Sequence, residues 1–341
     1  MYILCMENVD PCVNLAAEEY IMTHSTGDVL LLWRNDRTVV VGRYQNTLEE
    51  VNQEFALSHG ITVVRRNTGG GCVYHDLGNL NYSFITDAGN PEDLTIETFT
   101  QPVVDALRAL GVPAALTGRN DILAGEKKVS GCAQTIQGNR ILHHGTLLFS
   151  SHLEDVAAVL QVRPEKFQSK STKSVRSRVG NISDFLPVQM SVLQFRDYLA
   201  SWFGGEELVL TEEQWNEIRA LAESKYRSWD WTYRESPAFR FTNRQRFAGG
   251  TVEAGVSIED GYITDIALRG DFLARRDVAE IEQALRGQPL RQDALLRLLK
   301  GFALQDYFGT ITAEELTQCL LSVCMKHQLV PYIQHLPSGP L

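Results

Sequence analysis

The sequence lacks the features that mark zinc-binding proteins, membrane-spanning proteins and secreted proteins. It has no Cys-x-x-Cys pair and no histidine cluster with zinc spacing, and no apolar run approaches the roughly 18–20 residues of a membrane-spanning helix. Its start, MYILCMENVD, has neither a basic segment nor a long apolar run, so a signal peptide is not expected. We therefore predict a cytoplasmic protein with no membrane partner, whose cysteines are free thiols: Cys5, Cys12, Cys72, Cys132, Cys319 and Cys324.

Positive charge is also scarce. The chain has 32 Lys and Arg against 42 Asp and Glu, a net charge of −10. This balance argues against a general nucleic-acid binder, which would carry a basic face. The hydrophobic content of 44% and the charged content of 22% are ordinary for a globular protein. At roughly 150 residues per domain, 341 residues predict two domains.

Local patterns predict an α+β protein with a boundary near Pro237, so that the domains are 1–237 and 238–341. Apolar runs at 29–34 and 38–43 flank an Asn-Asp pair and predict a β-hairpin. The first domain should also contain helices at 12–24, 48–59 (after a capping box at Thr47), 96–110, 152–161, 192–203 and 212–227, and strands at 61–66, 72–76, 80–86 and within 114–150. The second should contain strands at 239–242, 248–258 and 262–268, followed by two helices.

A glycine-rich stretch carries the strongest functional signal. Residues 65–84 read RRNTGGGCVYHDLGNLNYSF, with three consecutive glycines at 69–71 behind two arginines. Glycine lets a ligand lie against backbone N–H groups, and guanidinium groups suit a carboxylate or phosphate. A tight glycine turn with surface arginines would look similar. Because His75, Asp76 and Asn79 add polar chemistry nearby, we favour a ligand site.

Three shorter motifs follow. The first is Gly118-Arg119-Asn120-Asp121, which by itself predicts a turn. The second is Lys127-Lys128-Val129-Ser130-Gly131, in which a lysine would by itself be expected to face solvent. The third motif is His143-His144-Gly145-Thr146. Adjacent strand residues face opposite sides, so these two histidines cannot share a metal. One is expected to line a pocket.

A basic segment, 163–178, has the sequence RPEKFQSKSTKSVRSR. Its six Lys and Arg face one Glu, a local excess of five positive charges in an acidic protein. A solvated loop would explain it. The functional hypothesis is a lid that closes over an anionic ligand. RNA contact is a third interpretation, which the acidic balance of the whole chain disfavours.

Together, RRNTGGGCVYHDLGN, GRND, KKVSG, HHGTLL and SVRSRVGNI resemble the lipoate–protein ligase family in content, order and spacing over nearly the whole chain. The resemblance implies a mixed β-sheet flanked by helices, similar to biotin ligases and class II aminoacyl-tRNA synthetases, with a small α+β accessory domain at the C-terminus. It implies that lipoate and ATP give lipoyl-AMP, and that the lipoyl group then passes to one lysine of a lipoyl domain. The implied acceptors are lipoyl domains of 2-oxoacid dehydrogenase complexes or the glycine-cleavage H protein.

The resemblance also implies roles for individual residues. Lys128 matches the family's essential lysine, Arg66 a position at the nucleotide and the lipoyl carbonyl, and Asp121 a position that helps hold Mg²⁺ or orients the acceptor lysine. Trp33 and Val73 are interpreted as walls of the lipoyl tunnel. The remaining implied contacts to lipoate or ATP are Thr68, Gly69, Gly70, Gly71, Cys72, Tyr74, His75, Asn120 and His144.

The sequence departs from the family pattern at Asn67 and Thr68, where the family commonly has a variable residue and a serine, and at two cysteines. Thr68 keeps the hydroxyl of the serine, so that departure changes little. Cys72 stands where a small alanine is usual, and Cys132 where serine or asparagine is common. Related transferases carry an octanoyl or lipoyl group as a cysteine thioester, and Lys128, four residues away, would favour a thiolate. A Cys132 transferase and a non-catalytic lipoate-binding homologue are therefore the alternatives to an ATP-dependent ligase.

Overall fold

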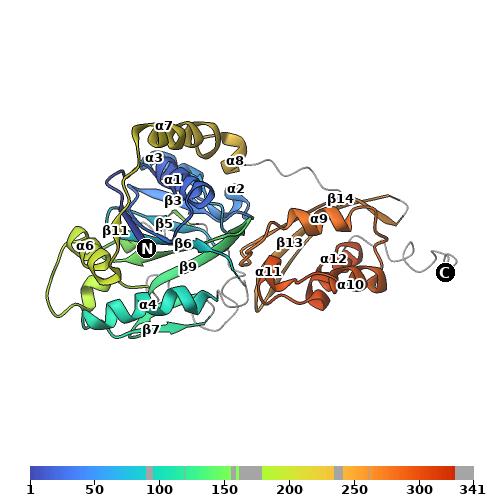
Figure 1. Cartoon of the computed structure of the whole chain (residues 1–341). Coiled ribbons are helices and arrows are strands. Elements are labelled where there is room, and N and C mark those ends of the chain that lie inside the picture. Colours follow the sequence, from blue (N-terminus) through green and yellow to red (C-terminus); the bar gives the residue numbers. More distant parts are fainter. Residues whose placement is uncertain are drawn as a thin grey trace. The chain divides into compact units, whose positions relative to one another are not determined.

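The computed structural model describes residues 1–89, 95–118, 120–154, 159–160, 179–233, 241–259 and 261–326. These residues form two compact units (Figure 1). The first unit contains Met1–Val41, Thr47–Asn67 and Cys72–Tyr233. The second unit contains the C-terminal part of the chain together with two short segments from the N-terminal part, Gly42–Asn46 and Thr68–Gly71.

A mixed sheet of eight strands forms the centre of the first unit. β1 pairs in parallel with β2 and β11, whereas the strands from β2 through β6, β10, β9, β8 and β7 pair antiparallel. The α+β prediction is therefore confirmed. In spatial order the strands are β11 (Glu206–Glu207), β1 (Tyr2–Cys5), β2 (Val29–Trp33), β6 (Asn79–Asp87), β10 (Arg140–Leu148), β9 (Lys127–Gln137), β8 (Asp121–Ala124) and β7 (Ala114–Thr117).

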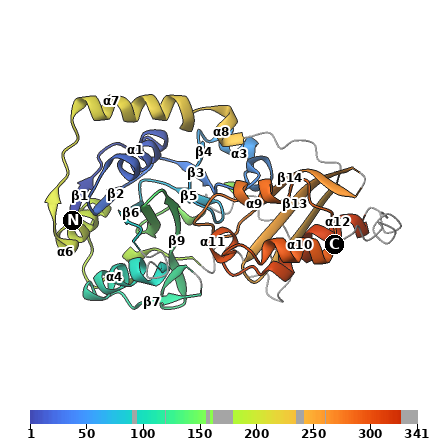
Figure 2. The same cartoon turned by 45° about the vertical axis from the view of Figure 1, so that its right-hand side comes forward.

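Helices cover both faces of this sheet (Figure 2). α4 (Ile96–Ala109) and α6 (Val192–Phe203) pack on one face, and α1 (Pro11–His24) and α7 (Glu212–Leu221) lie on the other. Because neither face meets water, β2 reads as an unbroken apolar run, and all five of its residues are buried.

The expected hairpin at 29–43 is wrong. β3 (Thr38–Val41) leaves the large sheet and forms a second sheet, in parallel with β4 (Thr62–Arg65) and antiparallel with β5 (Val73–His75). The Asn-Asp pair between the two apolar runs resembles an exposed turn, but Asn35 is fully buried and hydrogen-bonded to other side chains. Its amide therefore belongs to a buried polar network.

Two helices begin where the sequence predicts them, and each has a capping box at its N-terminus. Ser191 and Thr211 cap α6 and α7, each with a glutamine three residues later that completes the box. The helix expected at 48–59 is divided: α2 (Thr47–Glu50) is a single turn, and Asn52 caps a separate helix, α3 (Gln53–Ser58). The Thr47 hydroxyl donates to the carbonyl of Thr232.

The helix expected at 212–227 changes its pitch. After α7 the chain forms a π-helix, Ala222–Tyr226, and then α8 (Trp229–Tyr233). π-Helical turns occur mostly as single insertions and often at functional sites. This one brings Lys225 and Tyr226 to the side chain of Asn67, as described below.

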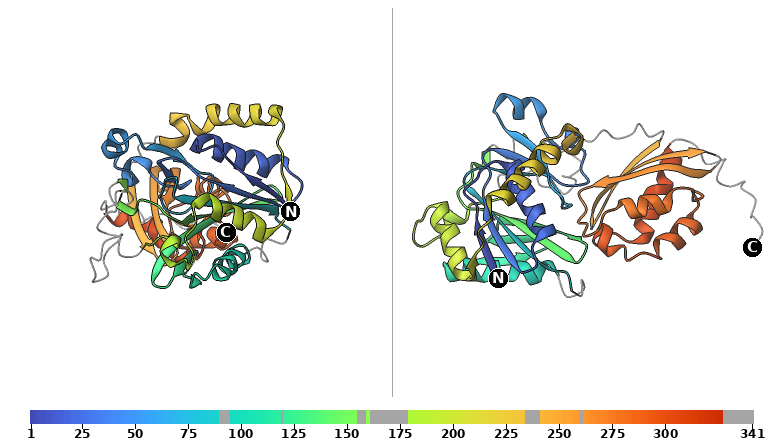
Figure 3. Two further views of the ribbon diagram at one scale, coloured as in Figure 1. Left: turned by 90° about the vertical axis from the view of Figure 1, so that its left-hand side faces the viewer. Right: turned by 45° about the horizontal axis from the view of Figure 1, so that its top comes forward.

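The second unit contains a three-stranded antiparallel sheet with helices packed against it (Figure 3). Its core includes Phe272, on which Tyr44 of the segment Gly42–Asn46 stacks with ring centroids 5.3 Å apart. The elements are β12 (Phe241–Phe247), β13 (Gly250–Glu259), β14 (Tyr262–Gly270), α9 (Ala279–Leu285), α10 (Gln292–Leu299), α11 (Gln305–Phe308) and α12 (Ala313–Lys326).

Candidate active site

The glycine loop, Thr68–Gly71, has two positions that only glycine can fill. A Cβ atom on Gly69 would lie 2.7 Å from the carbonyl oxygen of Phe272. Gly70 has a φ of +92° and donates its N–H to the same oxygen at 3.0 Å. Gly71 is exposed, and a Cβ there would have open space among the described residues.

The two arginines before the loop have different roles. Arg65 donates to the carbonyls of Trp231 and Thr232, both at 2.8 Å, and thereby holds the end of α8. Arg66 is buried and donates to the carbonyl of Val40 at 3.2 Å. Burial lowers the pKa of Arg66 to about 10, so its guanidinium is still charged at neutral pH. Arg66 is therefore a buried cation near the loop, and Arg65 is structural.

Asn67 follows these arginines and is clamped by α1 and the π-helix. Its amide nitrogen donates to Glu19 at 3.1 Å and to the hydroxyl of Tyr226 at 2.6 Å, and its oxygen accepts from Lys225 at 3.0 Å. Lys225 also pairs with Glu19 at 2.8 Å and lies 4.1 Å from the ring centroid of Trp231. The sequence signal was weak, because Glu19 and Lys225 are about two hundred positions apart.

Lys128 and Asp121 meet on neighbouring strands. The Lys128 Nζ lies 2.7 Å from the Asp121 Oδ1, and the two side chains are 39% and 34% exposed. The pairing of β8 with β9 shifts register between Ile122 and Leu123, and such irregularities re-aim side chains. A Cβ on Gly131 would lie 3.1 Å from the Lys128 Nζ, so this glycine leaves the room that the lysine uses. The pair is accessible to a ligand.

Asn120 and Cys132 are tied to each other through the backbone. The Asn120 side chain donates to the carbonyl of Cys132 at 2.6 Å, and the Cys132 N–H donates to the carbonyl of Asn120 at 3.0 Å. The Cys132 thiol is buried, 3.6 Å from the Thr100 hydroxyl. Burial raises the pKa of Cys132 to about 12, so the thiol stays protonated at neutral pH.

A buried polar group lies on the α1 face of the large sheet. The Glu18 carboxylate accepts from the Ser83 hydroxyl at 2.6 Å and contacts the His144 Nδ1 at 2.8 Å, and Trp33 donates its indole N–H to Ser83 at 2.8 Å. Glu18 is only 1% exposed. The sequence interpretation overlooked it, although it stands three residues from both Leu15 and Ile21, on the apolar side of α1.

His75 lies in the same region. Its ring is 6.2 Å from that of Trp33, edge to face, and its Nδ1 is 3.1 Å from the Asn35 amide nitrogen. Burial, together with the charges of Arg66 and His144, lowers the pKa of His75 to about 3. His75 is therefore a neutral imidazole under physiological conditions.

The adjacent histidine faces the opposite layer, as expected for neighbours on a strand. His143 is enclosed under α4, stacked on Phe99 at 4.9 Å, and its Nδ1 contacts Gln134 at 3.2 Å. Burial lowers its pKa to about 3. The two histidines therefore point to opposite sides of the sheet, and the expectation that one of them lines a pocket stays a prediction.

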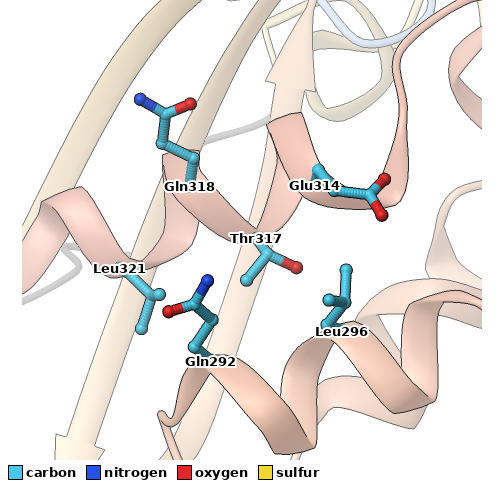
Figure 4. Close-up of a pocket in the computed structure, with 6 residues that line it drawn as sticks. All are labelled: Gln292, Leu296, Glu314, Thr317, Gln318 and Leu321. Atoms are coloured by element: carbon cyan, nitrogen blue, oxygen red, sulfur yellow. The ribbon is translucent and has the colours of Figure 1, made fainter.

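Other candidate features are absent from the described residues or lie away from these motifs. No three His, Cys, Asp or Glu side chains in the described ranges form a metal cluster, and none of the described helices is long and apolar enough to cross a bilayer. Arg119 and the basic segment 163–178 lie outside the described residues. A cavity of about 210 Å³ between α10 and α12 in the second unit is lined by none of the motif residues (Figure 4): Gln292, Leu296, Glu314, Thr317, Gln318 and Leu321.

Comparison with known proteins gives a consistent answer. The lipoyl protein ligase A/B catalytic domain matches residues 10–204, and the bacterial lipoate protein ligase C-terminus matches residues 236–320. The chain is 41% identical over 315 residues to the lipoate-protein ligase LplJ of Bacillus subtilis, covering 90% of this chain and 95% of that protein.

Solved structures with the same fold include relatives with ligands. A lipoate-bound Plasmodium falciparum LipL1 aligns with a TM-score of 0.76 at 20% identity, over 94% of this chain and 99% of that one. A Thermoplasma acidophilum bipartite lipoate protein ligase, studied with its E2 lipoyl domain, aligns at 0.60 with 31% identity over 70% and 98%. An ATP-bound lipoate-protein ligase A aligns at 0.58 with 30% identity over 68% and 98%.

These matches define the class as enzymes that attach an acyl cofactor to protein at the expense of ATP. Within that class, the chain belongs to the lipoate–protein ligase family, with both the catalytic and the C-terminal parts. It is an ATP-dependent ligase of this family.

Proposed function

We propose that the Lys128–Asp121 pair is the catalytic centre of both steps. In the first step a carboxylate oxygen of lipoate attacks the α-phosphorus of ATP, and the bond to pyrophosphate breaks. In the second, the acceptor lysine amine attacks the acyl carbon, and AMP leaves. Both partners in the first step are anions, so the reaction needs a cation where they meet. The observation that carries the proposal is the accessible Lys128 ammonium, with Gly131 leaving space beside it.

Asp121 has a second role in this scheme. When Lys128 turns to the substrate oxygens, the Asp121 carboxylate loses its partner at 2.7 Å. It is then available to accept a hydrogen bond from the acceptor lysine, whose amine must give up a proton as the amide forms. The same change in partner makes Asp121 the natural protein ligand for a cation that accompanies ATP.

Mg²⁺ fits this site only together with ATP. The described residues contain no cluster of three metal-ligating side chains, and Mg²⁺ is commonly held by one or two carboxylates plus substrate phosphates. Asp121 would supply the carboxylate, and the ion would neutralise phosphate charge. Asn120 lies beside Asp121, although its amide nitrogen already bonds the carbonyl of Cys132.

The lipoyl chain is proposed to lie on the α1 face of the large sheet. Trp33 and half-buried Val73 provide apolar walls there, and Arg66, His75 and His144 provide polar groups. The adenylate is proposed to lie against the glycine loop and the backbone that follows it. This assignment rests on the motif Thr68-Gly69-Gly70-Gly71-Cys72-Val73-Tyr74 and on the general use of glycine loops for phosphate.

We further propose that the acceptors are the lipoyl domains of 2-oxoacid dehydrogenase complexes or the glycine-cleavage H protein. The support is the archaeal relative studied with its E2 lipoyl domain. Incubation with lipoate, ATP and each purified acceptor tests this choice. Lipoylation of neither acceptor would contradict it.

If the protein were instead a transferase that carries the acyl group as a thioester on Cys132, this cysteine would be essential for transfer. Its thiol is buried beside Thr100 with a raised pKa, so it is a poor nucleophile. Cys132→Ser keeps the size and a polar hydrogen, and we expect it to retain most of the lipoyl transfer activity. Transfer to an acceptor domain, together with a hydroxylamine test for an acyl-enzyme, measures this. Loss of transfer with a hydroxylamine-labile acyl group on the wild-type cysteine would establish the transferase instead.

A further inference from the structure

Two chains of buried asparagines converge on one nitrogen of His75. In the first, the Asn14 amide nitrogen donates to the Asn35 Oδ1 at 3.0 Å, and the Asn35 amide nitrogen lies 3.1 Å from the His75 Nδ1. In the second, the Asn79 amide nitrogen donates to the Asn81 Oδ1 at 2.9 Å, and the Asn81 amide nitrogen lies 3.5 Å from the same Nδ1. All four amides are at most 2% exposed.

The backbone fixes the direction of the first chain. The Asn14 Nδ2 is 2.8 Å from the carbonyl oxygen of Arg34 and 3.1 Å from that of Asn8. Carbonyl oxygens only accept, so the nitrogen of Asn14 must occupy this position. The atom of Asn35 that faces it must then be the oxygen, and the nitrogen of Asn35 must face His75. An amide nitrogen only donates, so the His75 Nδ1 accepts and carries no proton.

The proton of the neutral ring must therefore be on Nε2. That nitrogen is buried and has no hydrogen-bond partner among the described residues. A buried donor without an acceptor destabilises a fold, and such groups in native proteins generally have a reason. Its surroundings include Trp33, Arg66 and His144, all in the region assigned above to the lipoyl chain.

We propose that Asn35 and Asn81 are positioning residues that hold His75 in its Nε2–H tautomer, so that it donates a hydrogen bond to the bound acyl substrate. The inference rests on the proposed placement of the lipoyl chain. The tautomer itself follows from the ligand-free geometry alone. Two acceptors on the substrate are chemically suitable, a carboxyl oxygen and a dithiolane sulfur.

The ring nitrogens of ¹⁵N-labelled wild-type enzyme report the tautomer directly by long-range ¹H–¹⁵N NMR. We expect an unprotonated Nδ1 and a protonated Nε2 for His75 throughout pH 5.5–8. A proton on Nδ1, or an imidazolium in this range, would overturn the relay even if the enzyme is a fully active ligase. Lipoate should shift the Nε2–H signal. If octanoate also shifts it, the acceptor is the carboxyl oxygen, and if it does not, a sulfur. No shift with either would overturn the hydrogen bond to substrate.

Asn35→Asp tests the relay in catalysis. The carboxylate has almost the shape of the amide but only accepts, so it should draw the proton of His75 to Nδ1. We expect kcat/KM for lipoate to fall about tenfold, roughly the effect of one hydrogen bond, while the KM for ATP is unchanged. The matched control is Asn243→Asp, which changes a buried amide that donates to the Cys319 carbonyl in the second unit. It should leave kcat/KM for lipoate close to the wild-type value.

A His75→Gln background separates positioning from a general packing defect. Glutamine keeps a donor at the corresponding end of the side chain and has no tautomers. Adding Asn35→Asp to this variant should therefore lower kcat/KM for lipoate much less than it does in the wild type. An equal loss in both backgrounds, or an Asn35→Asp enzyme with wild-type lipoate kinetics, would contradict the role of Asn35. If Asn35→Asp does not fold, the wild-type spectrum alone decides the tautomer.

Discussion

The ion pair of Lys128 with Asp121 is weak enough for the lysine to change partners when a substrate binds. Its ion pair with Asp121 is about one-third exposed on each side, and such pairs typically contribute only 0–1 kcal/mol. Exchanging the Asp121 carboxylate for the oxygens of a substrate therefore costs little. A more deeply buried pair would resist the same exchange.

Gly131 controls the position of this lysine. In Gly131→Ala the new methyl group would start 3.1 Å from the Nζ and 3.3 Å from the Cε of Lys128, so the flexible side chain must move. We expect the fold to survive and the rate of lipoyl-AMP formation to fall about tenfold or more, because small misplacements at a reacting centre have large kinetic effects. Pyrophosphate release measured alongside thermal unfolding tests this.

Gly71→Ala, in the glycine loop, is a control for the effect of an added methyl group on the melting temperature. Gly71→Ala adds a methyl group into open space among the described residues, so the melting temperature should be unchanged. If Gly131→Ala left both the rate and the lysine position unchanged, the space beside Lys128 would have no catalytic significance.

The π-helix is the clearest case of one element supporting another. Lys225 and Tyr226 reach Asn67, just before the glycine loop, and Glu19 joins them from α1. Burial alone would raise the pKa of Glu19, but hydrogen bonds from Lys225 and Tyr226 bring it below its usual value. Lys225→Met should therefore destabilise the first unit by about 1–3 kcal/mol and raise the KM for ATP.

An exposed ion pair on the neighbouring helix provides the comparison. Arg219 pairs with Glu212 on α7, and these side chains are 48% and 78% exposed. Arg219→Ala should change the free energy of unfolding by less than about 1 kcal/mol and leave the KM for ATP unchanged. Urea unfolding and steady-state kinetics distinguish the two variants. Equal effects would show that the clamp on Asn67 has no special role.

Short sequence patterns predicted the structure correctly where all the residues of the pattern lie in one helix or one strand. Ser191 and Thr211 start helices because the partner of each cap is three residues away. His143 and His144 face opposite layers because strand residues alternate. Lys128 and Asp121 were chosen for their resemblance to the ligase family rather than from a local pattern; the structure pairs them on the neighbouring strands β9 and β8, and their catalytic role stays a prediction.

Features that depend on distant partners could not be predicted. The apolar runs before and after Asn35 predict a hairpin, yet the partners of β3 are β4 and β5. Likewise, nothing near Glu18 in the chain indicates that its partners are Ser83 and His144. The cytoplasmic location and the lid hypothesis for 163–178 stay predictions from the sequence.

The whole first unit should lose stability in mild acid. His75 and His143 have pKa values lowered to about 3 by burial, whereas an unfolded histidine titrates near 6.5. Below about pH 6.5 the unfolded chain binds protons that the folded chain does not, so stability falls as pH falls toward 3. Each histidine contributes about 1.4 kcal/mol per pH unit. Urea unfolding at pH 7, 6 and 5 measures the slope.

His143→Leu separates this effect from the titration of other groups. The variant removes one of the two buried imidazoles, so the loss of unfolding free energy between pH 6 and 5 should shrink by about 1.4 kcal/mol. An unchanged slope in the variant would mean that His143 is not neutral in the folded protein.

The most direct test of the catalytic assignment is the formation of lipoyl-AMP without any acceptor domain. Lys128→Ala removes the cation proposed to stabilise charge in the first step, and Lys127→Ala removes its neighbour on β9 as a control. Pyrophosphate release from ATP with lipoate should fall roughly 10²–10³-fold in Lys128→Ala and stay near the wild-type rate in Lys127→Ala. A folded Lys128→Ala enzyme that makes lipoyl-AMP at the wild-type rate would contradict the central claim.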